Sequence, residues 1–398
     1  MRRRVDATPG SSRSPGASEA SAHRGRRIVT SRIVVAGGGT AGHVNPLLAT
    51  AVELRARGYQ VEALGTEEGL EADLVERAGF ALNVIEKVPF PRRPSASALR
   101  FPAKWRRAVE ECEKAIEGAA CVVGFGGYVS TPAYRAAKRL GVPVVIHEQN
   151  ARPGLANRVG ARFAELVALT FANTPLEARR GRTEVVGLPL RSAIRELALA
   201  RRTPEDALRA RLAAAERLGV DPDRRILLVT GGSLGALAIN EAVCRAAKAL
   251  PEGAAVVHLT GRGKDAPVRA AVEAAGVSDR WLVLDYLRTM EDALAVADLV
   301  LCRSGAGTVA EMTALGLPCV YAPLPIGNGE QRLNAHDHVA SGGALLIPDA
   351  QLDARAVETR VFALLASPEL DAMARASRGL GRVDAAADFS ALIEEVIG

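Results

Sequence analysis

The sequence predicts an α/β fold made of two Rossmann-like, doubly wound parallel sheets that face each other across a cleft. Short apolar runs alternate with segments of helical periodicity, which is the pattern of parallel strands joined by crossover helices. A strand, a glycine-rich turn and a helix occur in succession twice, near 33–57 and 226–250. A chain of 398 residues is also longer than one ordinary hydrophobic core supports, so two domains are expected.

The first of these strand–turn–helix units begins with the apolar run 33–36, which has the pattern of a buried strand. After the turn at 37–42, a helix is expected with Asn45 as its N-cap and Pro46 in its first turn. The backbone N–H groups and the positive dipole end of such a helix start favour a bound anion. His43 lies within the turn, where an imidazole suits a proton acceptor at the mouth of the cleft.

The same glycines at positions 37, 39 and 42 also match the dinucleotide-binding fingerprint. In that interpretation Glu62 or Glu67 would bind a ribose about twenty residues further on. An NAD-dependent oxidoreductase therefore stays open as an alternative, although the His43 imidazole would crowd a pyrophosphate.

The rest of the chain continues the alternation. Further strands are expected at 60–64, 119–125, 142–146, 166–169 and 184–186, and then at 226–230, 255–259, 281–285, 299–302 and 319–322. Further helices are expected at 70–78, at 131–139 with Thr131 and Pro132 at its start, and at 236–250. Ligands of such sheets bind outside the carboxyl ends of the strands, where the polar motif 147–150 falls. The segment 187–191 is expected to cross between the domains.

Two motifs of the second domain have two interpretations each. Thr308 and Glu311 form a capping box, or the turn before them binds a diphosphate while Glu311 accepts hydrogen bonds from a ribose. The polar loop 325–334 suits a sugar, whose hydroxyls need mixed donors and acceptors, but it also fits a solvated loop.

Two segments of the first domain are candidate binding surfaces. The segment 126–131 either lines an acceptor site or only starts a helix; its candidates are Gly126, Gly127, Tyr128, Ser130 and Thr131. The segment 88–107 mixes cations with large apolar side chains, as membrane-surface segments do, although its aromatic residues could equally be core. The membrane candidates are Phe90, Arg92, Arg93, Phe101, Lys104, Trp105 and Arg106.

The charge distribution argues against a nucleic-acid partner. The net charge is +6, but seven arginines against Asp6 and Glu19 place +5 of it in residues 1–30. The remainder is close to neutral, whereas a nucleic-acid protein spreads basic residues over a folded face. Residues 1–30 are expected to be a disordered basic extension, because they are rich in Ser, Gly, Pro and Arg. No apolar stretch suits a signal peptide or a membrane-spanning helix.

The cysteines and histidines predict no metal site. The five cysteines have neither metal nor redox spacing, which suits a reduced cytoplasmic protein; all but Cys112 lie in or beside apolar segments. His336 and His338 are two residues apart, on different faces of a helix. No cofactor is expected.

Five motifs in order resemble the MurG family of bacterial cell-wall glycosyltransferases, from about residue 31 to the end. They are Gly-Gly-Gly-Thr-Ala-Gly-His-Val-Asn-Pro at 37–46, His-Glu-Gln-Asn at 147–150, Gly-Gly-Ser at 231–233, Arg-Ser-Gly-Ala at 303–306 with Glu311, and Glu-Gln-Arg-Leu-Asn-Ala at 330–335. The resemblance implies the GT-B fold. It also implies inverting transfer of N-acetylglucosamine from UDP-N-acetylglucosamine to lipid I, the undecaprenyl-diphosphate-linked muramyl pentapeptide, which gives lipid II on the cytoplasmic face of the membrane.

The resemblance also implies roles for particular residues. His43 would be the base. The donor-binding residues would be Thr40, Ala41, Gly42, Asn150, Arg191, Ser233, Leu287, Ala306, Gly307, Thr308, Val309, Ala310, Glu311 and Gln331. Ala41, Gly307 and Glu330 depart from residues that are common in the family, and each could shift the fit of the donor.

The expected domains are an acceptor and membrane-association domain at 31–190, a donor-binding domain at 191–378, and a C-terminal helix at 379–398 that returns to the first domain. The expected partners are UDP-N-acetylglucosamine, lipid I and an anionic membrane surface to which the protein binds peripherally. Three alternatives stay open: another UDP-sugar enzyme such as a 2-epimerase or glycolipid glycosyltransferase, the oxidoreductase, and a non-catalytic binding module.

Overall fold

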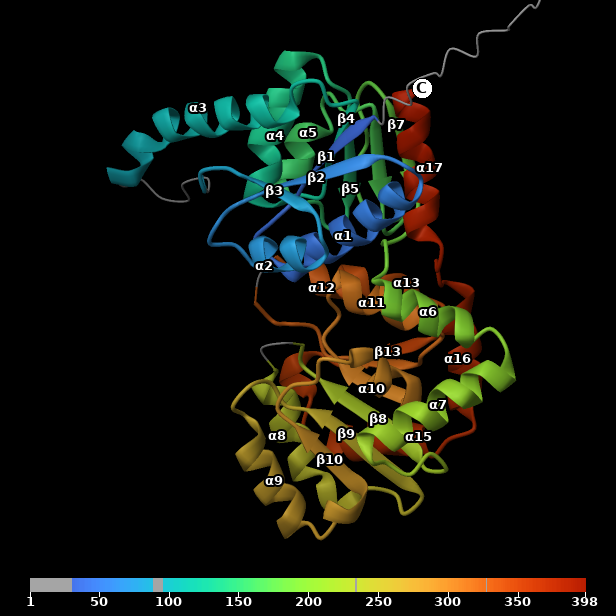
Figure 1. The fold of residues 1–398 in the computed structure, drawn as a ribbon. Helices are drawn as coiled ribbons and strands as arrows, with labels where there is room; N and C mark the ends of the chain where they lie inside the picture. Colours follow the sequence, from blue (N-terminus) through green and yellow to red (C-terminus); the bar gives the residue numbers. More distant parts are fainter. Residues whose placement is uncertain (1–30, 89–95, 233–234, 327) are drawn as a thin grey trace, which may run out of the picture. The chain divides into compact units, whose positions relative to one another are not determined.

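A computed structural model describes residues 31–88, 96–232, 235–326 and 328–398 (Figure 1). The first domain contains strands β1 (Arg32–Ala36), β2 (Gln60–Gly65), β3 (Ala81–Val84), β4 (Cys121–Gly124), β5 (Val144–Glu148), β6 (Leu166–Leu169) and β7 (Arg182–Val185). Its helices are α1 (Ala41–Ala56), α2 (Leu70–Arg77), α3 (Ala96–Ile116), α4 (Gly127–Leu140) and α5 (Leu155–Gly160).

The second domain follows the crossing segment at 187–191. Its strands are β8 (Arg225–Thr230), β9 (Ala254–Leu259), β10 (Trp281–Leu284), β11 (Leu299–Cys302), β12 (Cys319–Tyr321) and β13 (Ala344–Leu346). Its helices are α6 (Ser192–Ala200), α7 (Pro204–Leu218), α8 (Leu237–Arg245), α9 (Asp265–Ala274), α10 (Met290–Val296), α11 (Ala306–Leu315), α12 (Glu330–Asn334), α13 (His336–Ala340), α14 (Ala354–Ala356), α15 (Ala363–Leu365) and α16 (Glu369–Gly379). Short 3-10 turns lie at Ala247–Ala249, Ser278–Arg280 and Asp349–Gln351, and a π-helical turn lies at Val357–Phe362. The last helix is α17 (Ala385–Ile397).

Each domain is built on a doubly wound parallel sheet, which confirms the predicted fold class. The strand orders are β3-β2-β1-β4-β5-β6-β7 and β10-β9-β8-β11-β12-β13, and every pairing between these strands is parallel. The first strand of each domain, β1 or β8, lies in the middle of its sheet. The next two strands are added on one side of it and the remaining strands on the other, so the direction of strand order reverses between β1 and β4 and between β8 and β11. Ligands of open α/β sheets bind at such a reversal.

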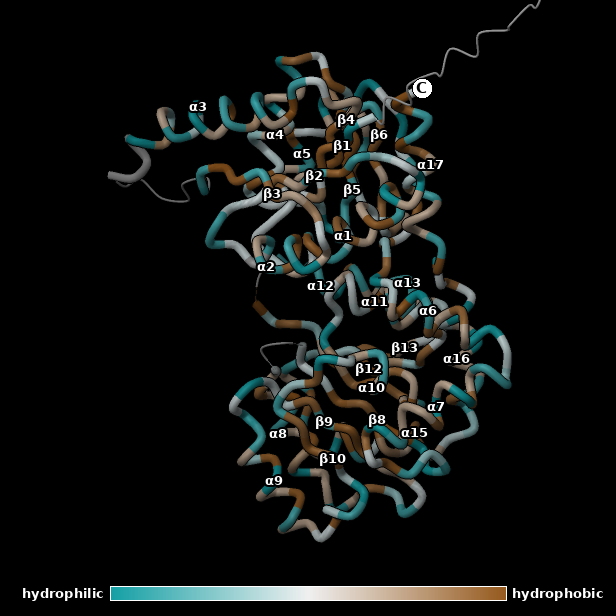
Figure 2. The backbone as a smooth tube through the Cα atoms, viewed as in Figure 1, coloured by the Kyte–Doolittle hydropathy of each residue, from teal (hydrophilic) through white to brown (hydrophobic). Residues whose placement is uncertain are grey.

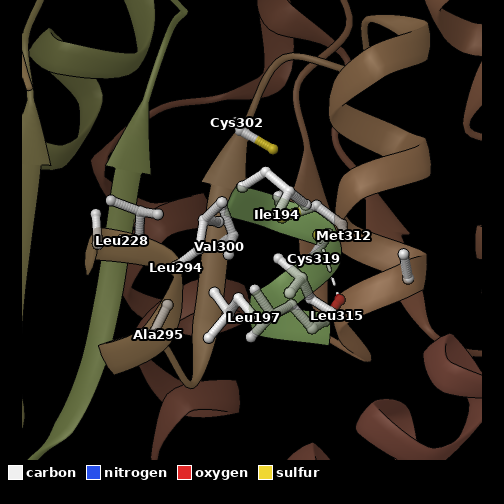
Figure 3. Close-up of a cluster of buried hydrophobic side chains, with 14 of the residues drawn as sticks. Ile194, Leu197, Leu228, Leu294, Ala295, Val300, Cys302, Met312, Leu315 and Cys319 are labelled. Carbon is white, nitrogen blue, oxygen red and sulfur yellow. Dashed lines mark hydrogen bonds between the residues drawn. The ribbon is translucent and has the colours of Figure 1, made fainter. Parts of the chain in front are cut away.

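Both faces of each sheet are covered by buried apolar side chains, as a parallel sheet requires. The strands are the most hydrophobic parts of the backbone trace (Figure 2). Figure 3 shows one layer of the second domain, in which Leu197 of α6 and Met312 of α11 pack onto Val300 of β11. This packing ties the first helix after the crossing segment to the second sheet.

Helix α17 packs against α1 and the first sheet, although it is the last element of the chain (Figure 1). Phe389 and Ile393 are fully buried in the same cluster as Ile33 and Leu47. Arg57 donates a 2.7 Å hydrogen bond to Glu394, which also joins α17 to α1. The core of the first domain is therefore completed by the C-terminus.

Two predicted helix starts were wrong. Helix α1 begins at Ala41, not beside Asn45, because the His43 and Val44 amides already donate to the Thr40 carbonyl at 3.0 and 3.2 Å. Helix α4 begins at Gly127, four residues before Thr131. In both helices a proline stands at the sixth residue, where it removes one N–H donor without ending the helix.

Two strands were missed, one predicted helix was too long, and Cys112 is buried although it lies outside the apolar segments. Strands β3 and β13 were not predicted, because each is a short edge strand with at most one buried residue. The helix expected at 236–250 ends at Arg245 and gives way to a 3-10 turn. Cys112 is fully buried, like most of the other cysteines, because α3 packs its side chain into the core of the first domain.

No helix among the described residues is long and apolar enough to cross a membrane.

Candidate active site

A cavity of about 1470 Å³ opens at the carboxyl ends of the central strands of both sheets. The turns after β1, β4 and β5 line it from the first domain, and those after β8 and β11 line it from the second. This is the strand-order reversal of each sheet, so the cavity lies where the fold class predicts a ligand.

The glycine turns after β1 and β4 touch each other, because these two strands are neighbours. Gly127 has φ +81°, and a Cβ there would lie 2.3 Å from the Gly38 carbonyl oxygen, so only glycine fits. The buried Ser130 hydroxyl bonds the Ala36 carbonyl at 2.9 Å and the Gly126 carbonyl at 2.7 Å. Ser130 thus ties the two turns together beneath the cavity.

His43 projects from the first turn of α1 and lines the cavity. Its Nδ1 lies 3.1 Å from the Gly38 carbonyl oxygen and 3.1 Å from the Thr40 hydroxyl. A carbonyl only accepts, so Nδ1 carries the proton and Nε2 is left with a free lone pair. Nε2 faces Gly126, where a Cβ would come within 3.3 Å of it. Burial lowers the pKa of His43, which keeps the imidazole neutral.

Sequence reasoning missed Glu71, a buried carboxylate on α2 that is 1 % exposed. It accepts hydrogen bonds from the Gly39 amide at 3.1 Å, the Thr66 hydroxyl at 2.9 Å and the Tyr128 hydroxyl at 3.1 Å. Burial opposes its ionisation, but these bonds outweigh burial and hold the pKa of Glu71 below its usual value. No local pattern marks this residue, because its partners come from three other segments.

The acids proposed for a dinucleotide ribose lie elsewhere. Glu62 bonds Arg32 at 3.2 Å and Asn83 at 3.0 Å, and neither Glu62 nor Glu67 lines the cavity.

The motif after β5 organises one wall of the cavity. The fully buried His147 lies 2.8 Å from the Gly187 carbonyl and so holds the crossing segment, and burial lowers its pKa to about 4. Glu148 accepts from the Asn150 and Gly154 amides, both at 3.0 Å, and burial raises its pKa. Asn150 and Glu148 both line the cavity.

A hydrogen-bonded contact joins the two domains beside this motif. Asn334 of α12 accepts a 2.9 Å hydrogen bond from the Ala151 amide. Its amide group lies 3.4 Å from the Asn150 side-chain oxygen and 3.3 Å from the Ser304 carbonyl. One buried side chain therefore holds the loop after β5 against the start of α11.

The capping-box interpretation of Thr308 and Glu311 was wrong. Helix α11 begins at Ala306 with Gly305 as its N-cap, so Thr308 is already inside the helix. The Glu311 carboxylate instead accepts from the Arg191 guanidinium at 2.9 and 3.2 Å. Burial raises the pKa of Glu311, although Arg191 acts against it.

The far end of the cavity is lined by the second domain. Leu287 is half-buried against the core, and beside it the Arg262 guanidinium lies 4.0 Å from the centre of the Tyr286 ring. The Gln331 side-chain oxygen accepts from the Leu324 amide at 2.9 Å, and no described residue accepts a hydrogen bond from its NH₂ group. The buried Ser304 hydroxyl has no partner among the described residues.

Most of the predicted site residues meet in this one cavity. Those that line it are Thr40, Ala41, Gly42, His43, Gly126, Gly127, Tyr128, Thr131, Asn150, Arg191, Leu287, Ala306, Gly307, Thr308, Glu311 and Gln331. Val309 is instead packed in the core, Ala310 packs against it, and Ser130 is buried behind the turns. The prediction for Ser233 lies outside the described residues.

The membrane candidates that the structure describes lie on α3, apart from the cavity. The rings of Phe101 and Trp105 stack with their centres 5.9 Å apart, and Trp105 also packs against the core. Lys104 pairs with Glu86, and Arg106 pairs with Glu110. The predictions for Phe90, Arg92 and Arg93 lie outside the described residues.

The described residues contain no group of three His, Cys, Asp or Glu side chains that could hold a metal ion. His336 bonds Asp337 at 2.8 Å, and His338 is buried against the Tyr321 hydroxyl at 2.9 Å.

Comparison with known proteins identifies the family to which this chain belongs. The chain matches the glycosyltransferase family 28 N-terminal domain over residues 33–169 and its C-terminal domain over residues 226–390. It is 50 % identical over 355 residues to a protein of Bifidobacterium adolescentis named UDP-N-acetylglucosamine–N-acetylmuramyl-(pentapeptide) pyrophosphoryl-undecaprenol N-acetylglucosamine transferase, covering 85 % of this chain and 90 % of the relative. A protein of the same name from Clavibacter michiganensis is 47 % identical over 370 residues, covering 92 % and 96 %.

Among solved structures, MurG of Acinetobacter baumannii matches with a TM-score of 0.73 and 29 % identity, covering 92 % of this chain and 99 % of that one. A putative UDP-N-acetylglucosamine 2-epimerase from Listeria monocytogenes matches at a TM-score of 0.65 but only 14 % identity, over 92 % and 96 % of the two chains, which shows the shared fold alone. The chain therefore belongs to the MurG family within glycosyltransferase family 28.

Proposed function

We propose that this enzyme transfers N-acetylglucosamine from UDP-N-acetylglucosamine to the 4-hydroxyl of the muramyl unit of lipid I, giving lipid II, with His43 as the general base. The curated relatives named above support the substrates. The observation that carries the role of His43 is its geometry: Gly38 holds Nδ1–H, and the free Nε2 faces the cavity floor at Gly126. A neutral imidazole of this tautomer is what proton abstraction requires.

The reaction proceeds as an in-line displacement. Nε2 of His43 takes the proton of the 4-hydroxyl while its oxygen attacks the anomeric carbon of the donor sugar. The bond from that carbon to the β-phosphate oxygen breaks on the opposite face, so configuration inverts and UDP leaves with the electron pair. Fixed backbone donors at a helix start stabilise such developing charge without reorganisation. We assign that task to the first amides of α11 and expect no metal requirement.

The second domain holds the donor in this proposal. Glu311 accepts hydrogen bonds from the ribose hydroxyls, beside Arg191. The NH₂ group of Gln331 donates to the sugar hydroxyls. The acceptor occupies the side of the cavity that is formed by the two glycine turns and Tyr128.

The enzyme works peripherally at the cytoplasmic face of the membrane in this proposal, with α3 on the anionic surface. Phe101 and Arg106 lie on this helix, where the paired aromatic rings and the cations provide the two components of interfacial binding.

The test is the replacement of His43 by Ala and by Gln, assayed with a lipid I analogue across pH. We expect both variants to lower kcat by about 10²- to 10⁴-fold, with the dissociation constant of the donor within a few-fold of wild type. His336→Gln is the matched control, because His336 is exposed and outside the cavity. If Gln restores most of the rate and the acidic limb of the pH profile stays, His43 positions the acceptor instead of taking its proton.

A further inference from the structure

Glu71 is a buried carboxylate that the mechanism above does not use. It pairs with no arginine or lysine among the described residues. A niche is built around it by glycines: a Cβ at Gly38, Gly65 or Gly69 would lie 2.6, 2.7 or 2.2 Å from an atom of the Glu71 side chain. Three positions must therefore be glycine, because any larger side chain there would displace the Glu71 carboxylate from its place beside the first glycine turn.

One peptide group connects this carboxylate to His43. The Gly39 N–H donates to Oε2 of Glu71 at 3.1 Å, and the Gly38 C=O accepts from Nδ1–H of His43 at 3.1 Å. Gly38 C=O and Gly39 N–H are the two ends of the same planar peptide unit. The carboxylate, the peptide group and the imidazole therefore form one hydrogen-bonded chain, and bonds in such a chain polarise one another.

We propose that Glu71 is a positioning residue, which acts through the Gly38–Gly39 peptide to hold His43 in the tautomer that leaves Nε2 free and to stabilise the imidazolium formed during transfer. This inference rests on the proposed role of His43 as base. In a serine-protease triad a buried carboxylate bonds the imidazole directly and has both effects. Here the peptide unit stands between the two groups and transmits the polarisation.

The Glu71 carboxylate offsets two effects that disfavour a protonated His43. His43 lies at a helix N-terminus, where the dipole opposes a positive charge. Burial lowers the pKa of His43, whereas the bond to Gly38 and the charge of Glu71 act in the opposite direction. Glu71 thus keeps the imidazole basic enough to accept a proton while burial keeps it neutral beforehand.

No other charged group among the described residues is joined to His43 through a single peptide group as Glu71 is. The Asn157 side-chain nitrogen donates to Glu148 at 2.9 Å, and a Cβ at Gly126 would lie 3.4 Å from that nitrogen and 3.3 Å from Nε2 of His43. The Lys87 ammonium lies 5.6 Å from the centre of the Tyr128 ring. From further elements, Arg152, Arg191 and Glu311 line the same cavity, and Arg191 and Glu311 neutralise each other.

The experiment compares Glu71→Gln with Thr66→Val in the full chain. Gln keeps the size of the side chain and removes its charge, whereas Thr66→Val removes a donor to Glu71 and keeps the charge. The pKa of His43 is read by NMR of labelled histidine, with the signal assigned from His43→Gln, and kcat is measured across pH with a lipid I analogue.

We expect Glu71→Gln to lower the pKa of His43 by roughly 0.5 to 1 and to move the acidic limb of kcat to lower pH by the same amount. The maximal kcat should fall by roughly 3- to 30-fold, less than the loss of the base itself, while the donor dissociation constant stays unchanged. Thr66→Val should not lower the pKa of His43.

An unchanged or raised pKa of His43 in folded Glu71→Gln overturns the inference. Glu71→Asp decides the matter if the Gln variant does not fold, because it withdraws the charge from the Gly39 amide and must also lower this pKa. Absence of transfer by the wild-type enzyme contradicts the proposed function instead, and the NMR titration still tests the connection between Glu71 and His43.

Discussion

Removal of the Glu311 carboxylate should weaken donor binding far more than it destabilises the fold. In Glu311→Ala, hydrogen bonds to a charged group are lost, which costs about 1.5–3 kcal/mol and raises the KM for UDP-N-acetylglucosamine by roughly 10- to 150-fold. The side chains of Arg191 and Glu311 are 37 % and 18 % exposed, so solvent screens their pairing. Its loss should lower the free energy of unfolding by less than about 1 kcal/mol.

The assay is the initial rate of UDP release against donor concentration at saturating acceptor, with a thermal melt of each variant. Glu291→Ala is the matched control, because this neighbouring carboxylate on α10 lies outside the cavity. Arg191→Met and the double variant add a mutant cycle: the two losses add if each residue binds the donor separately, and they do not add if Glu311 serves only to orient Arg191. A KM that stays within twofold of wild type would refute the assignment.

Three further predictions follow from the same structure. Replacing Phe101 and Trp105 by Ser should abolish cosedimentation with anionic vesicles while transfer to a short-chain soluble acceptor persists; binding that survives would place these rings in the core alone. Gly127→Ala should lower the melting temperature more than Gly141→Ala, since both have left-handed φ but only Gly127 has a backbone atom 2.3 Å from the added Cβ; equal losses would contradict the close approach. Burial lowers the pKa of His147 and His338 to about 4, so below about pH 6.5 the unfolded chain binds more protons than the folded one. As the pH falls from 6.5 to 5, each group should therefore lower the free energy of unfolding by up to about 1.4 kcal/mol per pH unit. A melting temperature that stays constant over that range would exclude this.

The sequence was informative where local pattern determines structure. The apolar runs and glycine turns located the central strands of both sheets, because buried parallel strands are continuous apolar runs. The edge strands β3 and β13 were missed, because they are short and poorly buried: no residue of β3 is buried, and in β13 only Ala344 is.

Helix starts and long-range partners were less predictable. Asn45-Pro46 and Thr131-Pro132 imitate an N-cap followed by a first-turn proline, yet each helix begins earlier, at a glycine turn. Glu71 resembles any acidic residue in the first turn of a short helix. Only the fold brings its partners together, because Gly39, Thr66 and Tyr128 follow β1, β2 and β4 and meet at the carboxyl edge of the first sheet.

The return of α17 to the first domain has a consequence for biosynthesis. The buried side chains of Phe389 and Ile393 reach the ribosome exit only after the whole second domain has been made. At about 5–20 residues per second, the roughly 200 residues between β7 and α17 take about 10 to 40 s to translate. Throughout this interval the apolar surface of α1 that receives α17 has no covering helix. The first domain therefore cannot complete the part of its core that α17 supplies until the second domain has been synthesised.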